Sequence, residues 1–160
     1  EFVPYDFLFH VTTVAMDRFR RLALPVPAFA DLCYLRLAQC MPDESVKVEI
    51  CEKIAAGVRR NLELDHAKWR TGYFIKPYWY AMRPDSPLHP TLRDEVSASL
   101  DFDIKTQEPD GNMQLTFEVN GEEMARWKSI WTLESLVVLQ NYGRIQKASP
   151  TFPNGPSLSA

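Results

Sequence analysis

The chain has 160 residues, of which 46% are apolar, 24% charged and 12% aromatic, and its formal net charge is −3. This composition excludes a disordered or collagen-like chain, because the apolar fraction is large enough to form the core of a globular domain. The acidic balance argues against a general nucleic-acid-binding protein, which would need an excess of basic side chains to neutralise phosphates.

The cysteines and the start of the chain bear on its cellular compartment. An odd set of three cysteines, Cys33, Cys40 and Cys51, is not typical of a secreted disulfide framework. We therefore predict reduced, buried thiols in an intracellular, cytoplasmic protein. No run approaches the roughly 18–20 apolar residues of a membrane span, and no signal-peptide pattern is visible. The chain begins with Glu1-Phe2 instead of methionine, so we expect a segment of a longer polypeptide.

The first 70 residues predict three helices. A first helix follows Pro4 and ends before Pro25, because its apolar residues recur at helical spacing. A second helix is expected over residues 27–41, and it is apolar on almost all sides. A third begins at Asp43, a good N-cap, and extends to residue 62 or as far as residue 70. Gly57 lies within it and would cost about 1 kcal/mol relative to alanine, which indicates close packing at this position.

The second half of the chain predicts extended structure. Residues 73–82 are dense in aromatic side chains and read as an extended segment, followed by a polar loop over residues 83–95. Alternating apolar and polar residues predict strands over residues 100–105 and 115–119, with a third strand over residues 122–131. Asn120-Gly121 is a strong hairpin signal between the last two strands. A helix from Glu122 is the alternative, since Met124, Trp127 and Trp131 also have helical spacing.

These elements predict an α+β fold. A three-helix N-terminal half packs on a three-stranded antiparallel β-meander, and Thr132 could cap a short C-terminal helix over residues 133–141. We expect one domain over residues 1–148, with a helical half over residues 4–71 and a sheet half over residues 73–148. Residues 149–160 are rich in proline and serine and are expected to form a flexible tail.

Motifs for the common enzyme chemistries are missing. The six glycines are far apart, which excludes a phosphate-binding P-loop and a dinucleotide-binding fold, because both need clustered glycines. There is no G-x-S-x-G nucleophile motif, and no C-x-x-C or H-E-x-x-H metal motif. The three histidines, His10, His66 and His89, stand alone. The sequence therefore predicts no cofactor and no metal site, and it favours a non-catalytic protein.

Two local pairs could still carry chemistry. His66 could be a general base oriented by Asp65, but neighbouring residues on a helix do not face each other, so a solvated helix end is the alternative. Asp101 and Asp103 share one face of the predicted strand, where they could bind a cation or divide acid and base roles. The alternative for this pair is the solvent face of an antiparallel sheet. A basic cluster over residues 18–21 is either a solvated face or an anion site.

The segment over residues 69–83 is the predicted binding region. It combines aromatic and basic side chains, which is typical of a protein interface or of a stacking platform for single-stranded nucleic acid. A buried segment joining the two halves of the domain is the alternative. The predicted interface residues are Trp69, Tyr73, Lys76, Tyr78, Trp79, Tyr80 and Arg83.

Three functional hypotheses follow from these features. The first is a non-catalytic structural or assembly module that binds protein partners, above all copies of itself, within a larger cellular or viral structural protein. The second is a small-molecule-binding domain or motif-poor enzyme with an aromatic pocket between helices and sheet; its candidate polar groups are His66, Asp101, Asp103 and Tyr80. The third is an RNA contact through the segment over residues 69–83. No membrane partner is predicted.

Overall fold

A computed structural model describes residues 4–145, and every regular element in this range is helical. The α-helices are α1 (Tyr5–Arg21), α2 (Ala30–Cys40), α3 (Glu44–Ala55), α4 (Pro77–Tyr80), α5 (His89–Thr106) and α6 (Glu122–Asn141). Two short 3-10 helices, η1 (Val58–Asn61) and η2 (Lys68–Arg70), lie between α3 and α4. The predicted α+β fold is therefore wrong, because residues 4–145 contain no strand and no β-meander.

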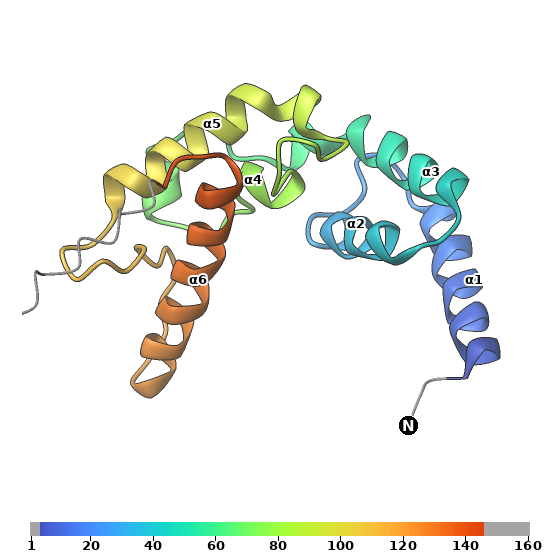
Figure 1. Ribbon diagram of the computed structural model, residues 1–160, viewed down its shortest axis with the longest axis horizontal. Coiled ribbons are helices and arrows are strands. Elements are labelled where there is room, and N and C mark those ends of the chain that lie inside the picture. The colour runs from blue at the N-terminus through green and yellow to red at the C-terminus, as the bar shows by residue number, and fades with distance from the viewer. Residues whose placement is uncertain (1–3, 146–160) are drawn as a thin grey trace, which may run out of the picture.

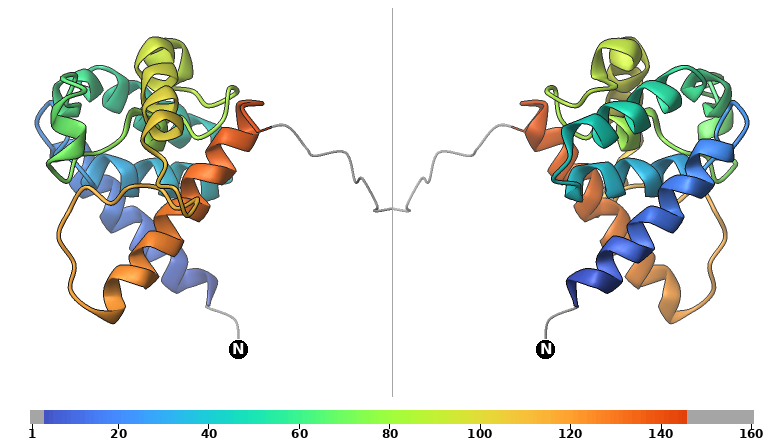
Figure 2. Two further views of the ribbon diagram at one scale, coloured as in Figure 1. Left: turned by 90° about the vertical axis from the view of Figure 1, so that its left-hand side faces the viewer. Right: turned by 90° about the vertical axis from the view of Figure 1, so that its right-hand side faces the viewer.

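The helices form an arch, with α5 across its top and α4 beneath α5 (Figure 1). α1 and α6 project from opposite ends of the arch towards the same side, as both views in Figure 2 also show. The core is one continuous cluster of buried side chains that runs from Met16 and Phe19 in α1 to Val138 and Leu139 in α6. The core residues of α1 and α6 thus lie in the C-terminal parts of these helices, and the N-terminal turns of both lie outside it.

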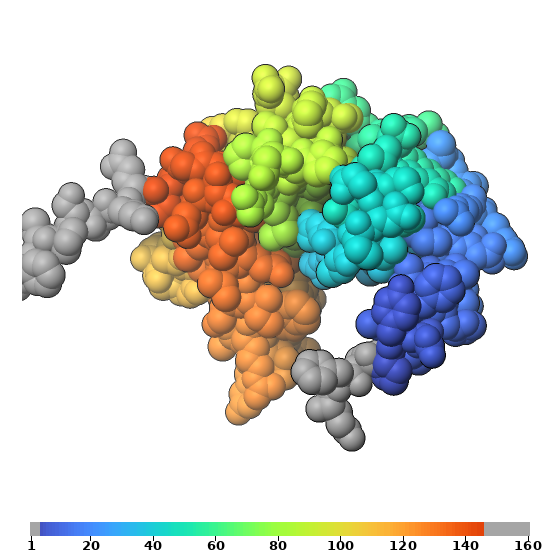
Figure 3. All heavy atoms as spheres, turned by 45° about the vertical axis from the view of Figure 1, so that its right-hand side comes forward, coloured from blue at the N-terminus to red at the C-terminus, as the bar shows by residue number. Residues whose placement is uncertain are grey.

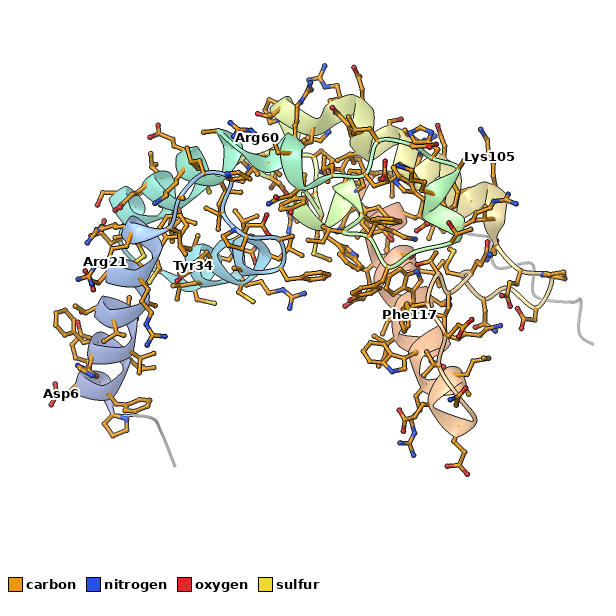
Figure 4. All side chains as sticks on the ribbon, turned by 180° about the vertical axis from the view of Figure 1, so that it is seen from behind. Asp6, Arg21, Tyr34, Arg60, Lys105 and Phe117 are labelled. Carbon is orange, nitrogen blue, oxygen red and sulfur yellow. The ribbon has the colours of Figure 1, made fainter. Side chains whose placement is uncertain are left out.

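The helices predicted for the first half are confirmed. Phe19 is fully buried, and the Tyr34 ring of α2 lies 4.6 Å from its ring (Figure 4). The Tyr34 hydroxyl also donates to the Ala15 carbonyl at 3.2 Å, which fastens α2 to α1. Asp43 caps α3 as expected, since its carboxylate accepts a hydrogen bond from the Ser45 backbone N–H at 2.9 Å.

The third helix is shorter than predicted, because the chain turns at Gly57 against the loop after α1. A side chain at this position would place its Cβ 2.9 Å from the Pro25 Cα, which confirms the close packing expected there. Asn61 in η1 then donates to the Val26 carbonyl at 2.7 Å and holds the turn to the same loop. The extended structure predicted for residues 73–82 is present only in part, since α4 begins at Pro77.

The first predicted strand is part of α5. The alternation of Leu100, Phe102 and Ile104 indicated a strand, but Phe102 is half-buried and Ile104 is exposed. The buried positions of the helix are spaced three or four apart: Leu92, Val96, Ser99, Leu100 and Asp103. The short alternation therefore lies inside a longer helical pattern, which begins with a proline in the first turn.

The remaining two strands are also absent. Residues 107–121 form a connection without strand pairing and place Met113, Leu115 and Phe117 on the core. Gly121 has a φ of 58°, so the left-handed backbone that Asn120-Gly121 indicated is present, but it precedes a helix and forms no hairpin.

Residues 122–131 form a helix and not the predicted third strand, so the alternative interpretation of this segment is correct. α6 continues through Thr132, the predicted cap, to Asn141. Because residues 4–145 contain no sheet, the sheet half predicted for residues 73–148 is not formed in the part that the structure describes. The flexible tail predicted for residues 149–160 lies outside the described residues.

Candidate functional site

The seven predicted interface residues lie in different environments. Four of them are buried: Trp69, Lys76, Tyr78 and Tyr80. Trp79 is half-buried, and Tyr73 and Arg83 are exposed. Arg83 is paired locally, with its guanidinium Nε 3.1 Å from Asp85. Of the seven residues, Tyr73, Trp79 and Arg83 therefore have exposed surface that a partner could contact.

The buried members of the segment belong to a polar network that joins α4, α5 and α6. The Lys76 ammonium forms an ion pair with the Asp103 carboxylate, and their side chains are 9% and 2% exposed. The other oxygen of Asp103 accepts hydrogen bonds from the Tyr78 hydroxyl at 2.8 Å and the Ser135 hydroxyl at 3.0 Å. The Lys76 Nζ also lies 4.9 Å from the centre of the Trp131 ring. Every charged group here has a partner, so the network is a structural device with no open position for a substrate.

The surroundings of the network change the proton affinities of its members. Burial lowers the pKa of Lys76, and the neighbouring Asp103 opposes this effect. Burial, together with the negative charge of Asp103, raises the pKa of Tyr78 well above its usual value. Tyr78 therefore stays a hydrogen-bond donor throughout the physiological range, which suits the fixed role of the network.

A second buried network fastens α2 to α4. Asp31 is fully buried at the start of α2 and accepts hydrogen bonds from the Tyr80 hydroxyl at 2.6 Å and the Asn61 amide at 2.7 Å. Burial raises the pKa of Tyr80, and the hydrogen bond to Asp31 adds to this effect. The two networks thus tie residues 76–80, in the middle of the predicted binding segment, into the core, which matches the alternative of a buried connecting segment.

Aromatic rings from four parts of the chain form a cluster beside α6. Its members are Phe29, Tyr73, Trp79, Phe117, Trp127 and Trp131. Tyr73 stacks on Phe29, with ring centres 5.4 Å apart, and meets Phe117 edge-on at 5.0 Å. Trp131 lies 5.7 Å from Phe117, which Figure 4 shows against α6. The cluster holds the connection over residues 107–121 to the helices, and Tyr73 and Trp127 leave its edge exposed.

An apolar pocket of about 230 Å³ lies between α2, α3 and α4. Leu32 and Leu35 of α2, Val48 and Cys51 of α3, and Trp79 of α4 contribute to its walls. Burial raises the pKa of the Cys51 thiol, so this cysteine is a weak nucleophile at neutral pH. The pocket can accept a small apolar molecule, but the predicted polar groups His66, Asp101 and Asp103 do not line it; Tyr80 does.

Most of the exposed large apolar side chains belong to the two projecting helices. The α1 face consists of Tyr5, Phe7, Leu8, Phe9, Val11 and Val14. The α6 face consists of Met124, Trp127, Ile130, Leu133, Leu136 and Val137. Phe9 and Leu133 are each 64% exposed. Figure 3 shows the free ends of the two helices as separate projections. Single exposed apolar residues are common, but six on each of two projecting helices indicate an interaction site.

The sequence analysis did not identify these faces. The helical spacing of the apolar residues in α1 predicted the helix but not which of them are buried, and only its C-terminal half contributes buried side chains, Met16 and Phe19. The sequence analysis assigned the first half of α6 to a strand. Two features of the sequence could have predicted the α6 face. Met124, Trp127 and Trp131 have helical spacing, and the helix has more apolar residues than a single stripe facing the core requires.

The predicted catalytic pairs are not formed. Asp101 and Asp103 point in different directions on α5, because residues two apart on a helix do not share a face. Asp101 is half-buried and pairs with Arg144, whereas Asp103 belongs to the buried network. His66 is exposed, and its ring lies 4.3 Å from the Trp69 ring. The neighbouring Asp65 carboxylate accepts a hydrogen bond from a backbone N–H and does not orient the histidine.

The remaining predicted groups are also separate from one another. Arg20 and Arg21 are engaged in ion pairs with Glu49 and Asp17, so the basic cluster at the end of α1 does not converge on an anion site. The three cysteines are free thiols, but the prediction that all are buried is wrong: Cys33 and Cys40 are exposed and Cys51 is half-buried. Within residues 4–145, no group of three or more histidine, cysteine, aspartate or glutamate side chains could hold a metal ion.

Comparisons with known proteins assign no family to this chain. No protein-family model matches it, and no match was found among curated proteins or solved structures. In the part of the chain that the structure describes, no helix combines the length and the apolar character needed to cross a membrane. The features of the described residues that bear on function are therefore the exposed faces of α1 and α6, the pocket and the buried networks.

Proposed function

We propose that the chain is a non-catalytic protein–protein interaction module that associates with copies of itself through the α1 and α6 faces. The exposure of large apolar side chains along both projecting helices is the observation that carries this proposal. Removing such side chains from water is favourable by about 25 cal/mol per Å² of apolar surface, so a partner that covers them gains free energy. Nothing in the described residues or the comparisons connects the chain with a virus or a larger structural assembly, so the proposal is limited to association.

The anchoring of the two helices supports a binding role. α1 is fixed to α3 at its C-terminal end, where Nε and Nη2 of the Arg20 guanidinium each donate to one oxygen of the Glu49 carboxylate at 2.8 Å. The Lys53 ammonium also donates to the Phe19 carbonyl at 2.7 Å. α6 is fixed near its C-terminal end by Ser135 in the buried network. Each helix is thus held at one end and presents its free end to a partner on a rigid base, which reduces the ordering cost of binding.

The molar mass of the full chain in solution tests the proposal. Light scattering after size exclusion, over a wide range of concentrations, should give a mass that rises above 18.4 kDa as concentration increases. Two double variants, Phe7→Ser with Val11→Ser and Leu133→Ser with Val137→Ser, should each weaken this association. Their side chains are exposed, so circular dichroism should show an unchanged helix content.

A matched control distinguishes a specific interface from non-specific hydrophobic association. Leu64 is 54% exposed and lies outside both helical faces, so Leu64→Ser removes a comparable apolar side chain elsewhere on the surface. It should leave the association constant unchanged. A strict monomer at all concentrations, or equal effects of the control and the α1 and α6 variants, would contradict the proposal.

The pocket between α2, α3 and α4 favours a second candidate function, the binding of a small apolar molecule. A volume of about 230 Å³ lies below the roughly 300–1,000 Å³ of typical ligand pockets, so it suits only a small molecule. Cys51 lines the pocket and is half-buried, so its modification by a thiol reagent reports on occupancy. A ligand in the pocket should slow this modification and raise the melting temperature, whereas the exposed Cys33 should react at an unchanged rate.

An intracellular, cytoplasmic location remains part of the proposal. The free thiols of Cys33 and Cys40 are exposed, and a reducing compartment would keep them in that form. An RNA contact finds less support, because Trp69 and Tyr78 of the aromatic segment are buried and Lys76 is paired internally. RNA binding that weakens steeply with salt would reverse this preference.

A further inference from the structure

We propose that two copies of the chain pair through α6, in an antiparallel crossing centred on Ile130. This inference rests on the proposed self-association and names the surface and the symmetry that carry it. Ile130 is 49% exposed, and it lies in the stretch over residues 122–130 where almost every side chain is exposed. A second α6 can therefore reach this part of the helix without displacing any residue of the core.

The spacing of the exposed residues creates a ridge with a symmetric centre. Side chains four residues apart form a ridge along a helix, and two such ridges interdigitate when helices cross at about 50°, the commonest packing class. Arg126, Ile130 and Glu134 form one ridge of α6, with the apolar residue in the middle. At a rise of about 1.5 Å per residue, the two charged side chains lie roughly 6 Å on either side of Ile130.

The opposite charges at the two ends of the ridge select the antiparallel arrangement. When two ridges run in opposite directions, each Arg126 lies beside the Glu134 of the second copy, so two attractive pairs form. A parallel arrangement would bring like charges together. A two-fold rotation exchanges the two copies and leaves the antiparallel contact unchanged. Such a contact closes as a dimer and does not continue into a fibre.

The Arg126 charge at one end of the ridge is available for this pairing. The Arg126 side chain is 68% exposed, and its ion pair with Glu123 at 3.0 Å is a surface pair of small energy that another carboxylate can replace. Glu134 is half-buried at the edge of the pocket. Trp127 and Leu133 lie three residues before and three residues after Ile130, so they add apolar contact symmetrically on its two sides.

Charge reversal by mixing tests the arrangement in the full chain. Arg126→Glu and Glu134→Arg each turn both attractive pairs into repulsive ones, so each variant alone should dimerise roughly tenfold more weakly. An equimolar mixture of the two variants places opposite charges side by side again. Analytical ultracentrifugation should then show a heterodimer with a Kd within about threefold of the wild-type value.

Cysteine crosslinking gives a second measurement that does not depend on charge. In a chain with Cys33, Cys40 and Cys51 replaced by serine, Ile130→Cys should form an intermolecular disulfide, because a residue at the two-fold axis meets its own copy. Disulfides need Cα atoms about 4.4–6.8 Å apart. Leu136→Cys is the matched control: Leu136 is 37% exposed, but six residues along the helix place it about 9 Å from the axis.

The outcomes separate this inference from the proposed function. A wild-type chain that stays monomeric overturns the self-association itself. A wild-type chain that associates, with charge-reversed variants that associate equally well, overturns the α6 pairing and leaves self-association standing. Equal crosslinking at residues 130 and 136 also overturns it. Selective crosslinking at residue 130, together with recovery of dimers on mixing, supports the pairing.

Discussion

Removing the negative charge of Asp103 should destabilise the protein strongly. The Lys76 and Asp103 side chains are 9% and 2% exposed, so in the Asp103→Asn variant the lysine charge has neither water nor a counter-ion. Breaking a buried ion pair from one side costs about 3–5 kcal/mol, a large part of the roughly 5–15 kcal/mol that stabilises a typical domain. For a chain of this size, the melting temperature should fall by about 6–20 °C.

Urea denaturation measures the effect directly. The Trp131 ring lies 4.9 Å from the Lys76 ammonium, so tryptophan fluorescence reports on the region that is perturbed. The double variant Lys76→Met with Asp103→Asn removes both charges and keeps an acceptor for the Tyr78 and Ser135 hydroxyls. It should recover most of the lost stability, because replacing a whole buried pair is far less costly than breaking it.

The pH dependence of the single variant provides an independent check. Burial lowers the pKa of Lys76 and Asp103 opposes this, so without Asp103 the pKa of the folded state falls further. Between that value and the unfolded pKa of 10.5, the unfolded chain binds more protons, and stability therefore rises with pH. The difference in the free energy of unfolding between the wild type and Asp103→Asn should therefore become smaller at alkaline pH. A deficit below about 0.5 kcal/mol at neutral pH, or a double variant as unstable as the single one, would refute the reasoning.

Three further predictions concern the core. Phe19→Ala should cost about 3–5 kcal/mol, because Phe19 is fully buried; a urea midpoint close to that of the wild type would contradict this. Gly57→Ala should destabilise by about 1–3 kcal/mol, since its Cβ would lie 2.9 Å from the Pro25 backbone; calorimetry should show a lower melting temperature. Burial and the hydrogen bond to Asp31 raise the pKa of Tyr80, so its contribution to the free energy of unfolding is complete below pH 10 and is lost as pH rises further. In Tyr80→Phe, the free energy of unfolding should therefore fall less steeply with rising pH above pH 10.

The local signals in the sequence determined the N-terminal helices. Asp43 caps α3 because a carboxylate at this position satisfies a free backbone N–H, and this depends only on residues close in the chain. The close packing at Gly57 was also visible, since a glycine inside a helical pattern needs a physical reason. The missing catalytic motifs were likewise a property of the sequence itself.

Tertiary structure alone decided the second half of the fold. Apolar and polar residues alternate over residues 100–105 as in a strand, but residues 4–145 contain no strand that could pair with them. The segment instead follows the longer helical pattern of α5. The same dependence on distant partners governs burial. Lys76 is inside because Asp103, 27 residues further along the chain in α5, pairs with it, and Ser135 of α6 donates a hydrogen bond to Asp103. The exposure of the α1 and α6 faces also follows from where the other helices end, because an apolar side chain is buried only where another element covers it.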